Sequence, residues 1–190
     1  DFLLRLMKSP AAREETWLGS AGTGHLDLQR MKAAGFAGGL FAIFVPPVSS
    51  GPPPDFKALM AHPPYDLPMP PAMDHATAQP AALEMAGLMH WMARSAPEAF
   101  ALCRSGAEIR AAMATGRIAG VMHMEGAEAI GPDLDALYLF HDMGLRSLGP
   151  VWSRPTAFGH GVPMAFPGTP DIGPGLTGAG KDLVRLCNRL

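Results

Sequence analysis

Apolar and polar positions form short alternating blocks that predict strands and helices in turn. One apolar, aromatic run at 38–45 is bounded by glycines and by two prolines. A second run, RIAGVMHMEG at 117–126, ends in an acid followed by glycine, and a third covers 145–151. Short apolar runs with such boundaries are typical of strands that are buried on both faces of a parallel sheet. We therefore expect parallel strands at these three places.

Helical spacing of apolar residues, with capping residues and glycine stops, predicts the helices. The expected helices cover 27–35, 81–95, 105–116, 132–143 and 177–190. The polar segment 9–24 and the glycine- and proline-rich segment 152–175 are expected to be loops, and the proline-rich segment at about 46–74 an ordered or semi-ordered excursion. Because the chain opens on Asp1 and an apolar segment without a preceding cap, we expect Asp1 to end a clipped first strand.

The order of these elements predicts an α/β fold of the (β/α)8 TIM-barrel type. Strands and helices alternate as in the first four β/α units of a barrel, which usually needs about 250 residues. A doubly wound sheet is the competing architecture, but no GxGxxG follows a strand and no GxxxxGK[ST] is present. We expect residues 1–190 to be the N-terminal part of a single barrel domain.

Composition excludes several classes of partner. The formal net charge is −2 and the pI about 6.4, which gives no electrostatic basis for binding nucleic acid. No apolar run reaches the roughly 18 residues that a transmembrane segment needs. Two distant cysteines without CxxC spacing, Cys103 and Cys187, are expected to be buried free thiols. Cytoplasmic and periplasmic or secreted locations are both compatible with a chain that opens on Asp1.

The strand at 117–125 places one carboxylate where parallel α/β folds carry their chemistry. Because side chains alternate along a strand, Val121, His123 and Glu125 share one face, and Met122 and Met124 share the other. Glu125 then lies at the C-terminal tip of the strand. A carboxylate there is either a solvated loop or capping residue, or a metal ligand or acid/base group.

Several stretches in family order resemble the membrane dipeptidase (renal dipeptidase) family of zinc peptidases. They are DFLL at 1–4, GHLDLQR at 24–30, GGLFA at 38–42, MEGA at 124–127, GLRSL at 144–148 and GLTGAGK at 175–181. Each motif is weak by itself, whereas the collinear set is specific. The resemblance implies a (β/α)8 barrel with two zinc ions that hydrolyses dipeptides by a metal-bridged hydroxide.

The resemblance also implies roles for particular residues. Asp1 matches the aspartate of the family's His-x-Asp ligand pair, and Glu125 matches the glutamate that bridges the two zinc ions and is therefore the expected catalytic residue. The histidine of the pair would lie two residues before Asp1, and the other ligand histidines would lie on strands after Leu190. The chain therefore carries two of about five expected ligands, and we expect it to be inactive alone.

Three residues after the fourth strand are expected to bind substrate. Trp152 aligns where several family members carry a substrate-binding histidine, and His160 is the nearest candidate to replace that histidine. Arg154 could pair bidentately with a peptide carboxylate, or could be an exposed loop arginine. His123, one step deeper than Glu125, is expected to be packed and hydrogen-bonded rather than a direct ligand.

Two other functions remain open from the sequence. The chain could be a non-catalytic fragment that acts as a binding or assembly module, or part of a metal-dependent amidohydrolase acting on a non-peptide amide or lactone. Four β/α units also leave open sheet edges, which favour association with another chain, such as a homo-oligomer.

Overall fold

The computed structural model describes residues 2–19, 22–47 and 55–190, in which a parallel sheet forms the centre. The strands of this sheet are β1 (Gly38–Phe44), β3 (Phe100–Leu102), β4 (Ile118–Glu125) and β5 (Leu145–Gly149). β4 is central: β1 runs along one edge of it, and β3 and β5 pair with the first and second halves of the other edge. The prediction of a buried parallel strand at 117–125 between 38–45 and 145–151 is confirmed.

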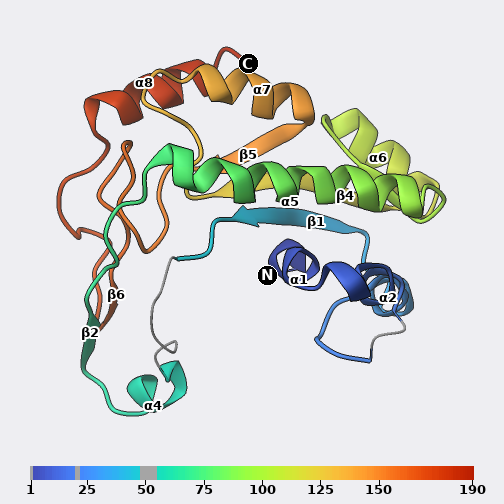
Figure 1. The fold of residues 1–190 in the computed structure, drawn as a ribbon, viewed down its shortest axis with the longest axis horizontal. Helices are drawn as coiled ribbons and strands as arrows, with labels where there is room; N and C mark the ends of the chain where they lie inside the picture. The colour runs from blue at the N-terminus through green and yellow to red at the C-terminus, as the bar shows by residue number, and fades with distance from the viewer. Residues whose placement is uncertain (1, 20–21, 48–54) are drawn as a thin grey trace.

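Helices lie before, between and after the strands along the chain and pack against the sheet (Figure 1). They are α1 (Phe2–Lys8), α2 (Arg13–Leu18), α3 (Leu28–Ala33), α4 (Phe56–Met60), α5 (His75–Ser95), α6 (Gly106–Ala114), α7 (Asp135–Met143) and α8 (Gly178–Cys187), with a 3-10 turn η1 (Pro10–Ala12) before α2. Within the described ranges, no helix combines the length and the apolar character needed to cross a bilayer.

The face of the sheet that meets the helices is the hydrophobic core. Met122 and Met124 of β4 are fully buried there together with Ile43 of β1. Phe41 of β1 and Phe100 of β3 pack edge to face, with ring centroids 5.3 Å apart. Because apolar area removed from water contributes roughly 25 cal/mol per Å², this shared core holds the helices onto the sheet.

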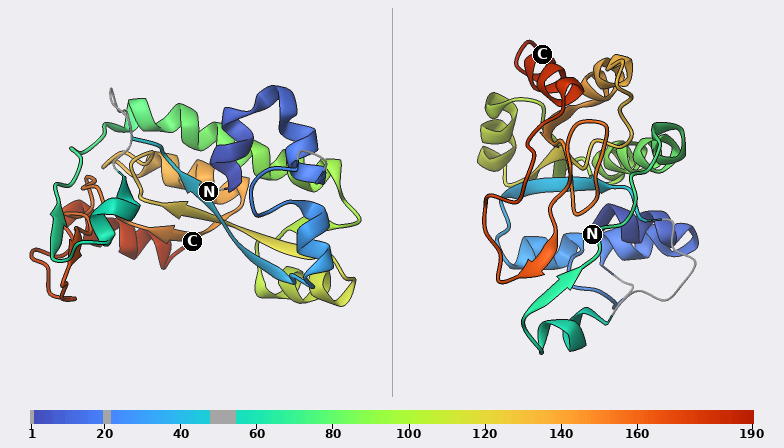
Figure 2. Two further views of the ribbon diagram at one scale, coloured as in Figure 1. Left: turned by 90° about the horizontal axis from the view of Figure 1, so that it is seen from below. Right: turned by 90° about the vertical axis from the view of Figure 1, so that its left-hand side faces the viewer.

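The opposite face of the sheet is much more open. Leu40 of β1 is 61% exposed, and Val121, His123 and Glu125 of β4 are only partly buried. The strands can be seen largely uncovered in the left-hand view of Figure 2, with helices behind them. This alternation along β4 agrees with the division into two faces that the sequence predicts.

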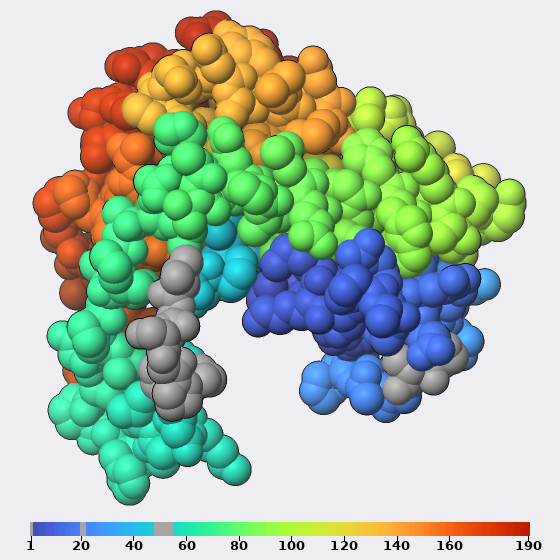
Figure 3. Space-filling view, viewed as in Figure 1, coloured from blue at the N-terminus to red at the C-terminus, as the bar shows by residue number. Residues whose placement is uncertain are grey.

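A small arm extends beyond the C-terminal ends of the strands (Figure 1). It consists of α4 and of two short antiparallel strands, β2 (Tyr65–Leu67) and β6 (Met164–Phe166). The rings of Tyr65 and Phe166 stack across this pair, with centroids 6.1 Å apart. Figure 3 shows an indentation of the surface between this arm and the N-terminal helices.

Some local expectations are wrong, each for a physical reason. The segment 9–24 is not all loop: it contains η1 and α2, because Trp17 is buried and its indole N–H donates to the Ser95 hydroxyl at 3.0 Å. The sequence predicts a helix that begins at 81, whereas α5 begins at His75 and includes Pro80. Proline usually marks a helix boundary, but here Asp74 caps the longer helix by accepting a hydrogen bond from the Thr77 N–H at 3.0 Å.

Candidate active site at the C-terminal ends of the strands

Glu125 is the last residue of β4 and lies between the ends of the two neighbouring strands. It is the register partner of Phe44 on β1 and of Gly149 on β5. Its side chain belongs to the open face of the sheet and is partly buried. No hydrogen bond or ion pair joins its carboxylate to another described residue, so both oxygens are available to a ligand from the open face.

His123 lies one layer below Glu125 on the same face. Its Nδ1 is 2.8 Å from the hydroxyl oxygen of Ser147, its register partner on β5. This contact fixes the orientation of the imidazole ring between two strands. The structure thus has His123 packed and hydrogen-bonded, as the sequence predicts.

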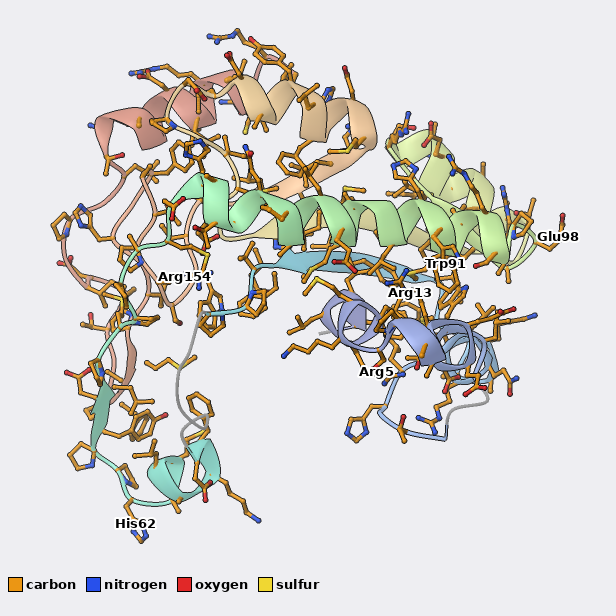
Figure 4. The ribbon with its side chains drawn as sticks, viewed as in Figure 1. Arg5, Arg13, His62, Trp91, Glu98 and Arg154 are labelled. Carbon is orange, nitrogen blue, oxygen red and sulfur yellow. The ribbon has the colours of Figure 1, made fainter. Side chains whose placement is uncertain are left out.

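The loop after Glu125 is held by a buried ion pair that the sequence analysis missed. Arg154 donates from Nε and from Nη2 to Oε1 of Glu128, at 2.8 and 2.6 Å. Nη2 also donates to the backbone carbonyl of Val45 at 2.9 Å. Figure 4 shows Arg154 beside the end of β1. Only the acidic character of Glu128, three residues after Glu125, could have pointed to this contact.

The expected substrate contact of Arg154 stays a prediction, but its surroundings differ from both expectations. The alternative of an exposed loop arginine is wrong, because the residue is 1% exposed. Two of its three guanidinium nitrogens already donate within the protein. A substrate carboxylate could therefore bind Arg154 only in addition to these internal hydrogen bonds.

Trp152 and His160 lie on the same loop after β5. The Trp152 ring packs edge-on against Phe44, with centroids 4.8 Å apart, and its carbonyl accepts from the Val162 N–H at 2.9 Å. Phe44 is the register partner of Glu125, so Trp152 is close to the candidate site. His160 is exposed on the loop. The substrate roles of both residues remain predictions.

Of the two expected metal ligands, Glu125 belongs to the described part of the chain. Asp1 lies outside the described residues. Across 2–19, 22–47 and 55–190, no three His, Cys, Asp or Glu side chains gather closely enough to hold a metal ion. Glu125 fits as one anionic oxygen ligand of a divalent cation, and the described residues do not complete a coordination shell.

The cysteines are separate from this site. Cys103 is buried as expected, whereas Cys187 is exposed, which corrects the expectation of two buried thiols. Burial, with Glu108 nearby, raises the pKa of the Cys103 thiol, and partial burial of the thiol raises the pKa of Cys187 although that residue as a whole is exposed. Because the thiolate is the reactive form, neither cysteine is activated as a nucleophile.

The fold and the position of Glu125 define an α/β chain of the TIM-barrel type with its candidate site at the strand ends. The family model for membrane dipeptidase (peptidase family M19) matches residues 3–190. The chain therefore belongs to the membrane dipeptidase family.

Solved structures agree with this assignment. The chain is 61% identical to a metallopeptidase from Rhodobacter sphaeroides that was solved with a phosphinate mimic of the dipeptide L-Ala-D-Ala, with a TM-score of 0.95 over all of this chain and 54% of that one. It is also 61% identical to the dipeptidase AC, a metallopeptidase of family M19, with a TM-score of 0.93 over all of this chain and 53% of that one.

This chain also covers about half of a curated relative. The chain is 42% identical over 166 residues to an uncharacterised protein encoded in the PQQ-III 3' region of Acinetobacter calcoaceticus, which covers 86% of this chain and 50% of that protein. The chain thus spans about half the length of the relatives that it matches.

Proposed function

We propose that the protein is a zinc-dependent dipeptidase and that this chain supplies the N-terminal part of its single barrel domain. Family membership and the two dipeptidase and metallopeptidase structures at 61% identity support hydrolysis of dipeptides. The observation that carries the proposal is the position of Glu125, at the tip of the central strand with no partner for its carboxylate among the described residues.

Glu125 and Asp1 are the proposed ligands of two zinc ions, with Glu125 as the ligand shared by both. A carboxylate has two oxygens, and one side chain can therefore bind two cations and offset their mutual repulsion. When bound, zinc supplies Lewis acidity and lowers the pKa of water to near neutrality. The strand end holds the Glu125 carboxylate toward the open face, where a dipeptide would enter.

The loop after β5 is the proposed substrate-binding element. Trp152, packed on Phe44 beside Glu125, offers an aromatic wall to a substrate side chain. His160, exposed on the same loop, offers a hydrogen-bonding group for the peptide. The arm formed by β2 and β6 stands beyond the same strand ends (Figure 1). Residues 46–74, of which 48–54 lie outside the described residues, are the proposed excursion toward the substrate.

Glu125→Gln in the protein with the complete barrel tests this function. The amide keeps the shape of the side chain but loses the charge that two cations require, so bound zinc should fall well below the wild-type ratio. Because Lewis-acid catalysis contributes several kcal/mol, kcat/KM for an Ala-Ala dipeptide should fall by roughly a thousandfold or more. Metal analysis and dipeptide turnover are the measurements.

Glu98→Gln is the matched control, because Glu98 is exposed and lies at the far end of the molecule (Figure 4). It should keep wild-type zinc and turnover. Undiminished turnover of Glu125→Gln would show that Glu125 is only a residue at a strand end. Hydrolysis of a non-peptide amide or lactone in preference to dipeptides would instead favour a related amidohydrolase.

A further inference from the structure

The buried pair Arg154–Glu128 connects three segments that end at the candidate site. Glu128 lies in the loop after β4, Arg154 in the loop after β5, and the Val45 carbonyl directly after β1. The side chains of Arg154 and Glu128 are 1% and 0% exposed. The Arg154 guanidinium therefore links the segments that follow β1, β4 and β5. These are the strand that carries Glu125 and its two neighbours at this end of the sheet.

Glu128 of this pair packs directly against the backbone that follows Glu125. Gly126 has a φ of +84°, and a Cβ at this position would lie 2.5 Å from Oε2 of Glu128. The carboxylate of Glu128 thus packs against the residue next to Glu125. The same turn is held from β5, because the Gly126 N–H donates to the Gly149 carbonyl at 3.1 Å. Glu128 is therefore in a position to influence the direction in which β4 ends.

Stability does not account for burying these two charges. Removing charged groups from water is costly, and the attraction within a buried pair offsets that cost only when the hydrogen bonding is complete. Here both donor nitrogens use one oxygen, while Oε2 of Glu128 and Nη1 of Arg154 are buried with no hydrogen-bond partner among the described residues. Replacing a buried ion pair with apolar residues of similar volume often leaves a protein as stable or more stable, so the geometry that this pair imposes is the better candidate for its role.

We propose that Arg154 and Glu128 are positioning residues that set the direction of the Glu125 carboxylate and the distance between the ends of β1, β4 and β5. The proposal rests on the proposed function, because the group being positioned is the metal-binding Glu125. The Arg154 guanidinium also lies 5.8 Å from the centre of the Trp152 ring, so the pair positions this substrate-facing ring as well. Arg154 thereby acts through its neighbours and needs no contact with the substrate.

The test replaces both charges together in the zinc-loaded protein with the complete barrel. For Arg154→Met with Glu128→Leu we expect a melting temperature equal to or above that of the wild type. Zinc affinity should fall by about 10- to 100-fold, as for residues that orient metal ligands. At saturating zinc, the loss in kcat/KM should come mainly from kcat, because misplacement of the reacting groups by about 1 Å costs roughly 100-fold.

Arg13 and Glu84 provide a matched control pair. Their side chains lie 3.4 Å apart but are 28% and 47% exposed, and Arg13 is on the N-terminal helices away from the strand ends (Figure 4). Arg13→Met with Glu84→Leu should leave zinc affinity and kcat at wild-type values. A fall in melting temperature of the Arg154/Glu128 variant with zinc affinity unchanged would make the pair purely structural and overturn the proposal.

Arg154→Lys decides the question if the double variant does not fold. Lysine keeps the charge beside Glu128 but cannot donate to Oε1 and to the Val45 carbonyl from one planar group. We expect weaker zinc binding and a lower kcat in a folded protein, and wild-type values of both would overturn the proposal. If Glu125→Gln loses zinc while both Arg154 variants behave like the wild type, the positioning role is contradicted but the proposed function is not. If Glu125→Gln keeps full activity, the proposed function itself is contradicted.

Discussion

At the scale of single residues, the turn after Glu125 depends on the absence of a side chain at Gly126. For Gly126→Ala we expect the free energy of unfolding to fall by roughly 1–3 kcal/mol, because alanine is strained at a φ of +84° and its Cβ would collide with the Glu128 carboxylate. Zinc affinity should fall as well, since the collision displaces the end of β4. Denaturant unfolding and zinc titration measure the two effects.

Gly116→Ala is the matched control for this change. Gly116 has a φ of +72°, but no atom lies within 4 Å of the position of its Cβ. Its substitution should carry only the conformational cost, about 1 kcal/mol, with wild-type zinc affinity. Equal losses of stability at both glycines, with zinc binding intact, would mean that the contact between Gly126 and Glu128 is not important.

The sequence places individual site residues only where a regular element positions them. Glu125 can be placed because an apolar strand with a period of two ends in an acid, and His123 follows from the same alternation. Glu128 and Arg154 cannot be paired in this way, because both lie in loops and are 26 residues apart. A loop arginine is usually exposed, and only the folded structure brings it against a buried carboxylate.

At the scale of elements, the long strands could be predicted and the shortest ones could not. β1, β4 and β5 are marked by their own apolar runs and bounding glycines. β3, β2 and β6 have three residues each, and each exists through pairing with a distant strand. Such pairing leaves no local period in the sequence, so these elements went unpredicted.

The pairing of β3 with β4 depends on a close contact at Gly120. A Cβ at this position would lie 2.2 Å from Cζ of Phe100. Phe100 has little freedom to move, because it packs edge-on against Trp17 and Phe41 with centroids 5.4 and 5.3 Å away. We expect Gly120→Ala to lower the free energy of unfolding by about 1–3 kcal/mol through overpacking, as measured by denaturant unfolding.

Phe100→Leu provides the internal control, because the smaller side chain makes room for a methyl group at position 120. The double variant should be less destabilised than the sum of the two single variants, since neighbouring changes couple. Strict additivity of the two losses would show that the cost at Gly120 arises from something other than Phe100.

At the scale of the whole molecule, the helices cover one face of the sheet and leave the other accessible (Figure 2). In a TIM barrel the uncovered face becomes the interior, filled by side chains from all the strands. Leu40 and Val121 belong to this face, and their exposure reflects a sheet that does not close within the described residues. If residues 1–190 are prepared alone, we expect them to associate through the open edges of β1 and β5, as homo-oligomers or aggregates.

We expect the 190-residue chain, prepared alone, neither to hydrolyse dipeptides nor to hold zinc tightly. Glu125 is the one proposed ligand that a strand of the described structure anchors, and one carboxylate cannot assemble a two-metal site. Asp1, the other proposed ligand, lies outside the described residues, and two carboxylates are fewer than the four ligands that one zinc ion usually takes. Metal analysis after gel filtration and dipeptide turnover are the measurements, with the Glu125→Gln chain as the reference. Stoichiometric zinc in a monomeric chain, with turnover above that reference, would contradict this prediction and would mean that half a barrel suffices for catalysis.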